Sequence, residues 1–244
     1  MSVARLDPEF DPRLVEAAVL AAARRPPAHG DFHAERDTIY QVADPEPREA
    51  AFQALHARWF ARLGLDRPFR GALAEQPAIA AGCGRWLVAQ ARGRREEAAD
   101  LLIAPDVGPT LLVRVTPEAV TAPESLWRLL RRELLHIADM LDPAFGYEAA
   151  LPRGAAGSGR ERLVRENYRV LWNAWVDGRL VRQGTLPATA RGERLADFAR
   201  AFPHLGAGAE AAFDRVFDGP RLTHAVLVAF AAGGPEGAPR DAKR

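Results

Sequence analysis

Apolar residues recur at helical spacing in two long stretches of the chain. In the first, between Thr121 and Pro143, every third or fourth residue is apolar, which is the pattern of a helix with one buried face. These residues are Leu126, Leu130, Leu134, Ile137 and Leu141. The second stretch, from Gly159 to Gln183, has the same pattern and is followed by Gly184, a residue type that commonly ends helices. Both stretches predict long amphipathic helices packed against a core.

Shorter segments complete the predicted secondary structure. Helices are expected over 11–25, 44–63, 191–201, 207–217 and 220–230, whereas the polar segment 29–40 is expected to be a loop. Three runs rich in β-forming residues, RWLVAQA, ADLLIA and TLLVRV, follow one another after Gly84. The charged RGRREE between the first two runs is expected to form a hairpin turn. The runs therefore predict a small, mostly antiparallel sheet of three strands.

The order of these elements predicts an α+β fold. A three-stranded sheet packs on the amphipathic helix of 121–143, and a mostly helical C-terminal lobe follows. We expect a single globular domain over 1–231, with the N-terminal helices and the sheet in 1–142 and the helical lobe in 143–231. Residues 232–244 are rich in Gly, Pro and charge and have little apolar surface, so a disordered tail is expected there.

The composition excludes several classes of function. The 33 basic and 32 acidic side chains leave a net charge of +1, so no nucleic-acid-binding surface is expected. The single lysine, Lys243, argues against Schiff-base and P-loop chemistry, and no serine lies in the Gly-x-Ser-x-Gly pattern of serine hydrolases. The single cysteine, Cys83, can form neither an internal disulfide nor a thiolate zinc knuckle. The chemistry is therefore left to His, Asp, Glu, Arg, Tyr and one thiol.

The same sequence gives no signal for a membrane. No apolar run approaches the roughly 20 residues that a membrane helix needs. The N-terminal MSVARLDPEFDP also lacks the apolar stretch of a secretory signal. We therefore expect a cytoplasmic protein with no membrane partner.

The segment Arg132-Glu133-Leu134-Leu135-His136 carries the strongest chemical suggestion. It resembles the His-Glu-x-x-His helix of zincin metallopeptidases, with Arg132 in place of the first histidine. In that motif two residues four positions apart lie on one helical face and hold one ion, and the glutamate reaches the metal-bound water. The resemblance implies that His136 binds zinc and that Glu133 acts as general base in the hydrolysis of a peptide bond.

The resemblance also implies further site residues. Asp139 and Asp142 follow the motif histidine by three and six positions, and Asp142 has the spacing of a third ligand in one zincin variant. In another arrangement the third ligand comes from the next long helix, where Glu161 is the acid nearest the apolar face. Tyr147 or Tyr168 would stabilise a developing oxyanion. TLLVRV would be the edge strand beside the metal-binding helix.

Arg132 leaves the function open between two classes. A guanidinium stays protonated and repels Zn²⁺, so a zinc site would need carboxylate ligands in its place. The first hypothesis is a metallopeptidase that acts on a peptide or protein substrate. The second is an inactive pseudopeptidase without zinc that serves as a protein-binding module. A third reading is an α+β domain in which the Glu-x-x-His spacing is a coincidence of an amphipathic helix.

Three weaker candidates have simpler structural explanations. Cys83, between two glycines, resembles the nucleophile of papain-like proteases but lacks the residues that flank it there, so a buried thiol is favoured. His33, Glu35 and Asp37 could hold a metal from the predicted loop, but alternating polar residues in loops are usually solvated. His56 lies on an aromatic helix face and is favoured as a histidine at the edge of the core.

Overall fold

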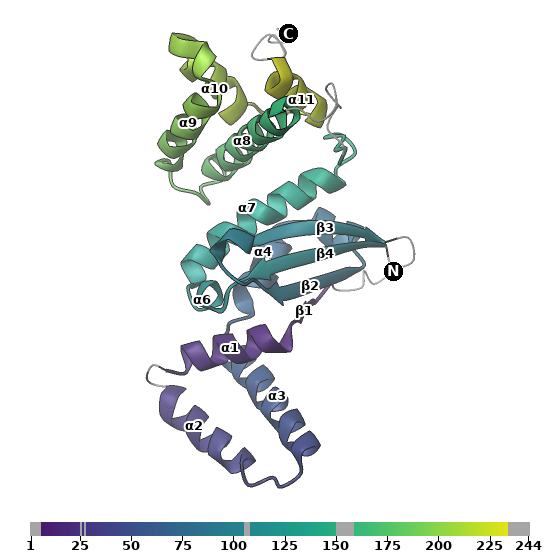
Figure 1. Cartoon of the computed structure of the whole chain (residues 1–244), viewed down its shortest axis with the longest axis vertical. Coiled ribbons are helices and arrows are strands. Elements are labelled where there is room, and N and C mark those ends of the chain that lie inside the picture. The colour runs from purple at the N-terminus through teal and green to yellow at the C-terminus, as the bar shows by residue number, and fades with distance from the viewer. Residues whose placement is uncertain (1–5, 25, 27, 105–107, 150–158, 234–244) are drawn as a thin grey trace. The chain divides into compact units, whose positions relative to one another are not determined.

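The computed structural model describes residues 6–24, 26, 28–104, 108–149 and 159–233 (Figure 1). The chain divides into two compact units, Met1–Ile137 and Ala138–Arg244. This division falls a few residues before the one expected at 142–143. Of the residues expected in a tail, 232 and 233 belong to the last helix, and 234–244 lie outside the described residues.

The first unit contains one mixed sheet of four strands. They are β1 (Pro8–Phe10), β2 (Arg85–Gln90), β3 (Ala98–Ala104) and β4 (Gly108–Val115). Their order across the sheet is β1-β2-β4-β3, in which β1 and β4 run parallel to β2 and only β3 is antiparallel to its neighbour. The α+β class is thus confirmed, whereas the prediction of three mostly antiparallel strands is wrong.

Two features of the sequence explain these errors. Strand β1 is only three residues long, which is too short for an alternating pattern to reveal it. The charged run RGRREE contains a short 3₁₀ turn, Arg94–Glu96, and leads from β2 to β3. These two strands are separated by β4, so the run is a crossover and not a hairpin turn.

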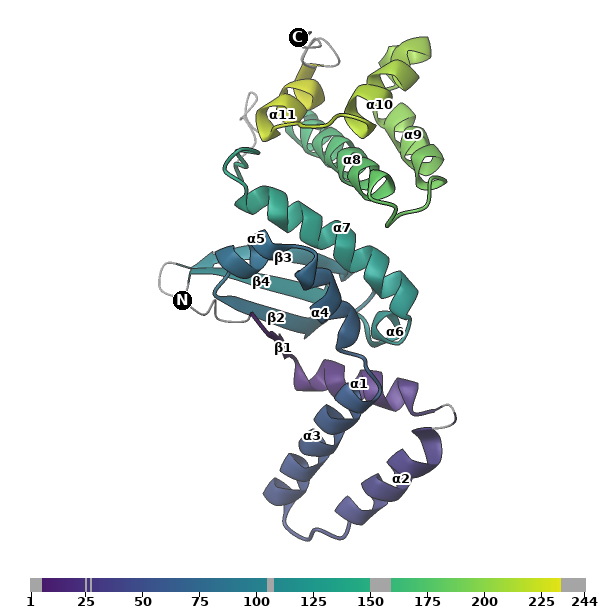
Figure 2. The ribbon, with the colours of Figure 1, turned by 180° about the vertical axis from the view of Figure 1, so that it is seen from behind.

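Seven helices lie wholly or largely in the described part of the first unit. They are α1 (Pro12–Ala22), α2 (Ala28–Ile39), α3 (Pro45–Arg62), α4 (Arg67–Ala74), α5 (Pro77–Gly82), α6 (Pro117–Val120) and α7 (Pro123–Leu141). Helices α4 and α5 lie over one face of the sheet (Figure 2), where the ring of Phe69 approaches that of Trp86 on β2 to 6.3 Å. The predicted apolar stripe of α7 is confirmed by complete burial of Leu126, Leu130 and Leu134.

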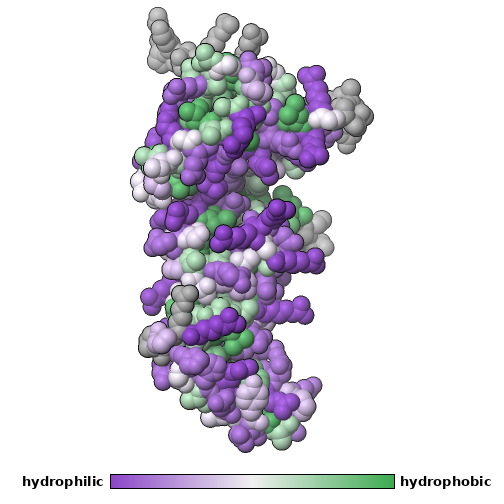
Figure 3. All heavy atoms as spheres, turned by 60° about the vertical axis from the view of Figure 1, so that its left-hand side comes forward, coloured by the Kyte–Doolittle hydropathy of each residue, from purple (hydrophilic) through white to green (hydrophobic). Residues whose placement is uncertain are grey.

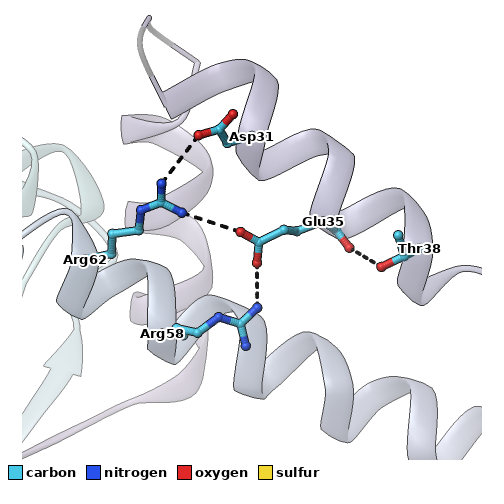
Figure 4. Close-up of polar contacts among 5 residues, drawn as sticks. All are labelled: Asp31, Glu35, Thr38, Arg58 and Arg62. Carbon is cyan, nitrogen blue, oxygen red and sulfur yellow. Dashed lines mark hydrogen bonds and ion pairs between the residues drawn. The ribbon is translucent and has the colours of Figure 1, made fainter.

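Helix α2 replaces the loop expected over 29–40. Its sequence is polar and contains Gly30, and among its residues only Phe32 is buried. Ion pairs with α3 take the place of an apolar face (Figure 4). Glu35 lies between Arg58 and Arg62 at 2.6 and 3.5 Å, and Asp31 pairs with Arg62 at 3.4 Å. An apolar-periodicity criterion cannot detect a helix held in this way.

The second unit is helical. Besides the end of α7 it contains α8 (Gly159–Arg182), α9 (Ala190–Ala201), α10 (Ala209–Phe217) and α11 (His224–Gly233), with a 3₁₀ segment at Pro203–Gly208. Helix α8 packs against α9, α10 and α11. It ends at Arg182, and Gly184 two residues later has a φ of 70°, the left-handed conformation that is common just after a helix C-terminus.

The surface is predominantly polar where it is seen in the space-filling view. Figure 3 shows a face on which hydrophilic residues predominate and hydrophobic residues gather in small, separate patches. None of the described helices combines the length and apolarity required to cross a membrane.

Candidate functional site

The motif residues of α7 lie half-buried beside the sheet. Within the first unit, Glu133 accepts a hydrogen bond from the backbone N–H of Ala99 on β3, with 3.2 Å between Oε2 and N. Arg132 and His136 are half-buried as well. The strand next to this helix is therefore β3, and the expectation that TLLVRV forms the edge is wrong, because β4 is enclosed between β2 and β3.

Strand β3 has one edge that is not paired within the sheet. Because the Ala99 N–H bonds to Glu133, it points away from β4, and the alternation of an antiparallel ladder directs the N–H groups of Leu101 and Ile103 the same way. The side chains nearby are apolar yet exposed, at 45% for Leu102 and 76% for Ile103. An edge of this kind can accept an additional extended strand.

Asp139, in the second unit, is a buried member of an ion pair. Its carboxylate accepts hydrogen bonds from Nη1 and Nη2 of Arg179 at 2.8 and 2.5 Å, and from Nε1 of Trp172 at 2.8 Å. The Arg179 guanidinium also lies 3.8 Å from the ring centroid of Trp175. Burial raises the pKa of the Asp139 carboxyl above its usual range, and the hydrogen bonds from Arg179 and Trp172 oppose this shift.

The other predicted ligands also have local partners. Asp142 lies one residue beyond the end of α7 and accepts a hydrogen bond from the backbone N–H of Ala144 at 2.8 Å, which closes a turn. Glu161, in the first turn of α8, pairs with Arg165 at 3.3 Å. The carboxylates of Asp142 and Glu161 thus both bond to a nearby group of their own unit.

Tyr147 belongs to an aromatic cluster in the second unit. Its ring lies 5.6 Å from that of Trp172 and 5.4 Å from that of His224, the first residue of α11. The hydroxyl of Tyr168 lies 2.8 Å from Nδ1 of His224. Burial raises the pKa of both tyrosines and lowers that of His224. These phenols are thus held in their neutral form.

Sequence reasoning missed His224 as a member of this cluster. The residue stands alone ahead of an apolar helix, and no acid or histidine lies at ligand spacing from it. Its partner, Tyr168, is far away in the sequence, so only tertiary structure joins the two. The stripe that places Tyr168 on the buried face of α8 was the one usable signal.

The residues of the predicted site do not fit a zinc ion. Within the described residues, no three or more His, Cys, Asp or Glu side chains converge in a way that could hold a metal. Zinc sites use at least three protein ligands at about 2 Å. The motif glutamate instead bonds to β3, and Asp139 bonds to Arg179 and Trp172.

The structure also shows where the three weaker candidates lie. Cys83 is buried, and burial raises the pKa of its thiol, which disfavours the reactive thiolate. Glu35 is engaged by two arginines of α3 (Figure 4) and lies on a helix rather than a loop. His56 is 5% exposed on α3.

Comparison of the chain with protein-family models, curated proteins and solved structures finds no match.

Proposed function

We propose that this chain is a zincin-like pseudopeptidase, a protein that binds extended polypeptide without hydrolysing it. The observation that carries the proposal is the environment of Asp139. Asp139 lies three residues after His136 and is a candidate to replace the first histidine of the motif as a zinc ligand. Both of its carboxylate oxygens, however, accept hydrogen bonds from Arg179, and one also accepts a hydrogen bond from Trp172.

Arg132 supports the same proposal from the helix itself. It occupies the position of the first zincin histidine and carries a permanent positive charge. Glu133, which would act as general base in an active zincin, is within hydrogen-bonding distance of the edge-strand backbone. The residues that match the motif thus favour a structural role over metal chemistry.

The outer edge of β3 beyond Ala99, which no strand of the described sheet pairs with, supports a binding role. Main-chain groups of Leu101 and Ile103 point away from the sheet, and exposed apolar side chains flank them. Addition of an extended strand would satisfy these groups and cover the apolar side chains. The proposed partner is therefore an unfolded or extended polypeptide segment.

Zinc titration by isothermal calorimetry tests the first half of the proposal. We expect weak or no binding to the wild type. Arg132→His restores a nitrogen one turn before His136 and should raise zinc affinity by orders of magnitude. Adding His136→Ala should abolish that gain. Tight one-to-one binding by the wild type would refute the proposal and favour the metallopeptidase, whereas no gain in Arg132→His would remove the zincin relationship.

Fluorescence anisotropy with fluorescein-labelled, reduced casein tests the second half. Casein is an unstructured polypeptide, and we expect saturable binding with no zinc-dependent cleavage. Ile103→Pro removes one outward N–H and should weaken binding, whereas Ala54→Ser at an exposed position of α3 serves as the matched control. Equal binding by both variants would exclude the β3 edge, and zinc-dependent cleavage would favour the enzyme.

A further inference from the structure

A cavity of about 730 Å³ lies in the first unit, away from the motif residues of α7. It is lined by residues of α1, α2 and α3, together with the end of β1 and the start of α4. Its volume lies within the range of about 300–1,000 Å³ that is typical of small-molecule sites. Aromatic side chains form its apolar wall: Phe10, Tyr40, Phe52 and Phe60.

His56 contributes an unpartnered polar atom to this wall. The residue is 5% exposed, and its ring stacks between those of Phe32 at 6.1 Å and Phe52 at 6.4 Å. Its Nε2 is buried and has no hydrogen-bond partner among the described residues. Buried polar groups are normally satisfied, so an exception next to a cavity indicates a missing partner.

Arg36 adds a positive charge that no described carboxylate pairs with. Its guanidinium lies 5.5 Å from the ring centroid of Tyr40 and 6.0 Å from that of Phe52, and its buried Nε has no hydrogen-bond partner within the described chain. No carboxylate of the described residues lies within ion-pair distance of it. By contrast, Arg70 at the same cavity is paired with Asp66 at 2.9 Å.

Two carboxylates of the lining provide the opposite charge. Glu16 on α1 and Glu49 on α3 form no ion pair with any described residue, and the hydrogen bond that Glu49 accepts comes from the neutral amide of Gln53. Both negative charges raise the pKa of the His56 imidazole, and the positive charge of Arg36 lowers it. Glu16, Glu49 and Arg36 therefore all lie near that ring. Burial nevertheless lowers the pKa of His56, so its imidazole is neutral at pH 7.

We propose that this cavity binds a small zwitterion of dipeptide size with an aromatic or apolar body. The carboxylate of the ligand pairs with Arg36 and accepts a hydrogen bond from His56. Its ammonium group faces Glu16 and Glu49, and its side chains pack on Phe52 and Phe60. An anion such as a phosphate, with more than one negative charge, is disfavoured by the two glutamates. This site does not depend on the proposed pseudopeptidase function.

Three related dipeptides test the proposal by isothermal calorimetry on the full chain. The probes are phenylalanyl-leucine, its N-acetyl form, which lacks the ammonium group, and its C-terminal amide, which lacks the carboxylate. We expect one-to-one binding of the free dipeptide and at least about tenfold weaker binding of both analogues, because each loses a charge-assisted hydrogen bond. Absence of binding by the free dipeptide at millimolar concentration would overturn the proposal, as would equal binding of either analogue.

Variants locate the ligand in this cavity. Arg36→Gln should lower the affinity for the dipeptide about tenfold or more and remove its advantage over the amide. Arg48→Gln, an α3 arginine outside the lining, is the matched control. Ala57→Trp introduces a large side chain at an exposed lining position and should block binding without disturbing the core. Unchanged affinity in both Arg36→Gln and Ala57→Trp would overturn the assignment to this cavity.

Discussion

Removal of Arg179 should destabilise the second unit strongly. The Asp139 side chain is 7% exposed and the Arg179 side chain 19%, so their ion pair is largely shielded from water. Arg179→Ala deletes two hydrogen bonds to the carboxylate and leaves only the bond from Trp172. Two charge-assisted hydrogen bonds of about 1.5–3 kcal/mol each predict a loss of about 3–6 kcal/mol. The cost of breaking a buried pair from one side, about 3–5 kcal/mol, agrees with this value.

Urea unfolding followed by tryptophan fluorescence measures this loss, since Trp172 and Trp175 both adjoin the pair. Arg165→Ala, which breaks the exposed pair with Glu161, is the matched control and should change the free energy of unfolding by less than about 1 kcal/mol. Combining Asp139→Leu with Arg179→Met should restore much of the stability, because no buried charge is then left alone. A loss below about 1 kcal/mol in Arg179→Ala would refute this account of the pair.

Two further predictions concern the core and the pH dependence. Leu134→Ala should lower the free energy of unfolding in urea by about 2–5 kcal/mol, because Leu134 is fully buried. Arg128→Ala, at an exposed position of the same helix, should change it by no more than about 0.5 kcal/mol. Equal losses would mean that the buried face of the helix is misassigned. Burial lowers the pKa of His56 and His224, so the unfolded chain binds more protons below about pH 6.5 and the free energy of unfolding should fall as the pH drops from 7 to 5. His224→Gln should flatten this fall relative to the exposed His204→Gln, and an unchanged slope would contradict the assigned direction.

Local periodicity explains which elements the sequence predicts correctly. The stripes of 121–143 and 159–183 produce α7 and α8 because residues three and four apart share a helical face, whatever the rest of the chain does. Helix α2 was missed since Glu35 and the arginines of α3 hold it, and these partners are distant in sequence. The strand order was missed for the same reason, because register between β1 and β2 depends on segments far apart along the chain.

The candidate site shows the same division between local and distant information. Glu133 and His136 lie next to the apolar stripe of α7 on a helical wheel, and the structure shows both half-buried. The ion pair of Asp139 with Arg179 and the contact of Tyr168 with His224 join separate helices, so no spacing rule connects them. The cavity in the first unit escaped prediction because Arg36 lies in the segment expected to be a loop.

The parallel pairing of β1 has a consequence for the order of folding during synthesis. Phe10 is synthesised well before its partner on the neighbouring strand, Val88, and β2 in turn pairs with β4, which ends at Val115. At translation rates of about 5–20 residues per second, roughly 5–20 s separate the synthesis of Phe10 from that of Val115. Helices α1 to α3 can form within this interval, whereas β1 must wait for its sheet. A nascent chain arrested before Arg85 would therefore lack the partner of its first strand and leave that strand open to chaperones or proteases.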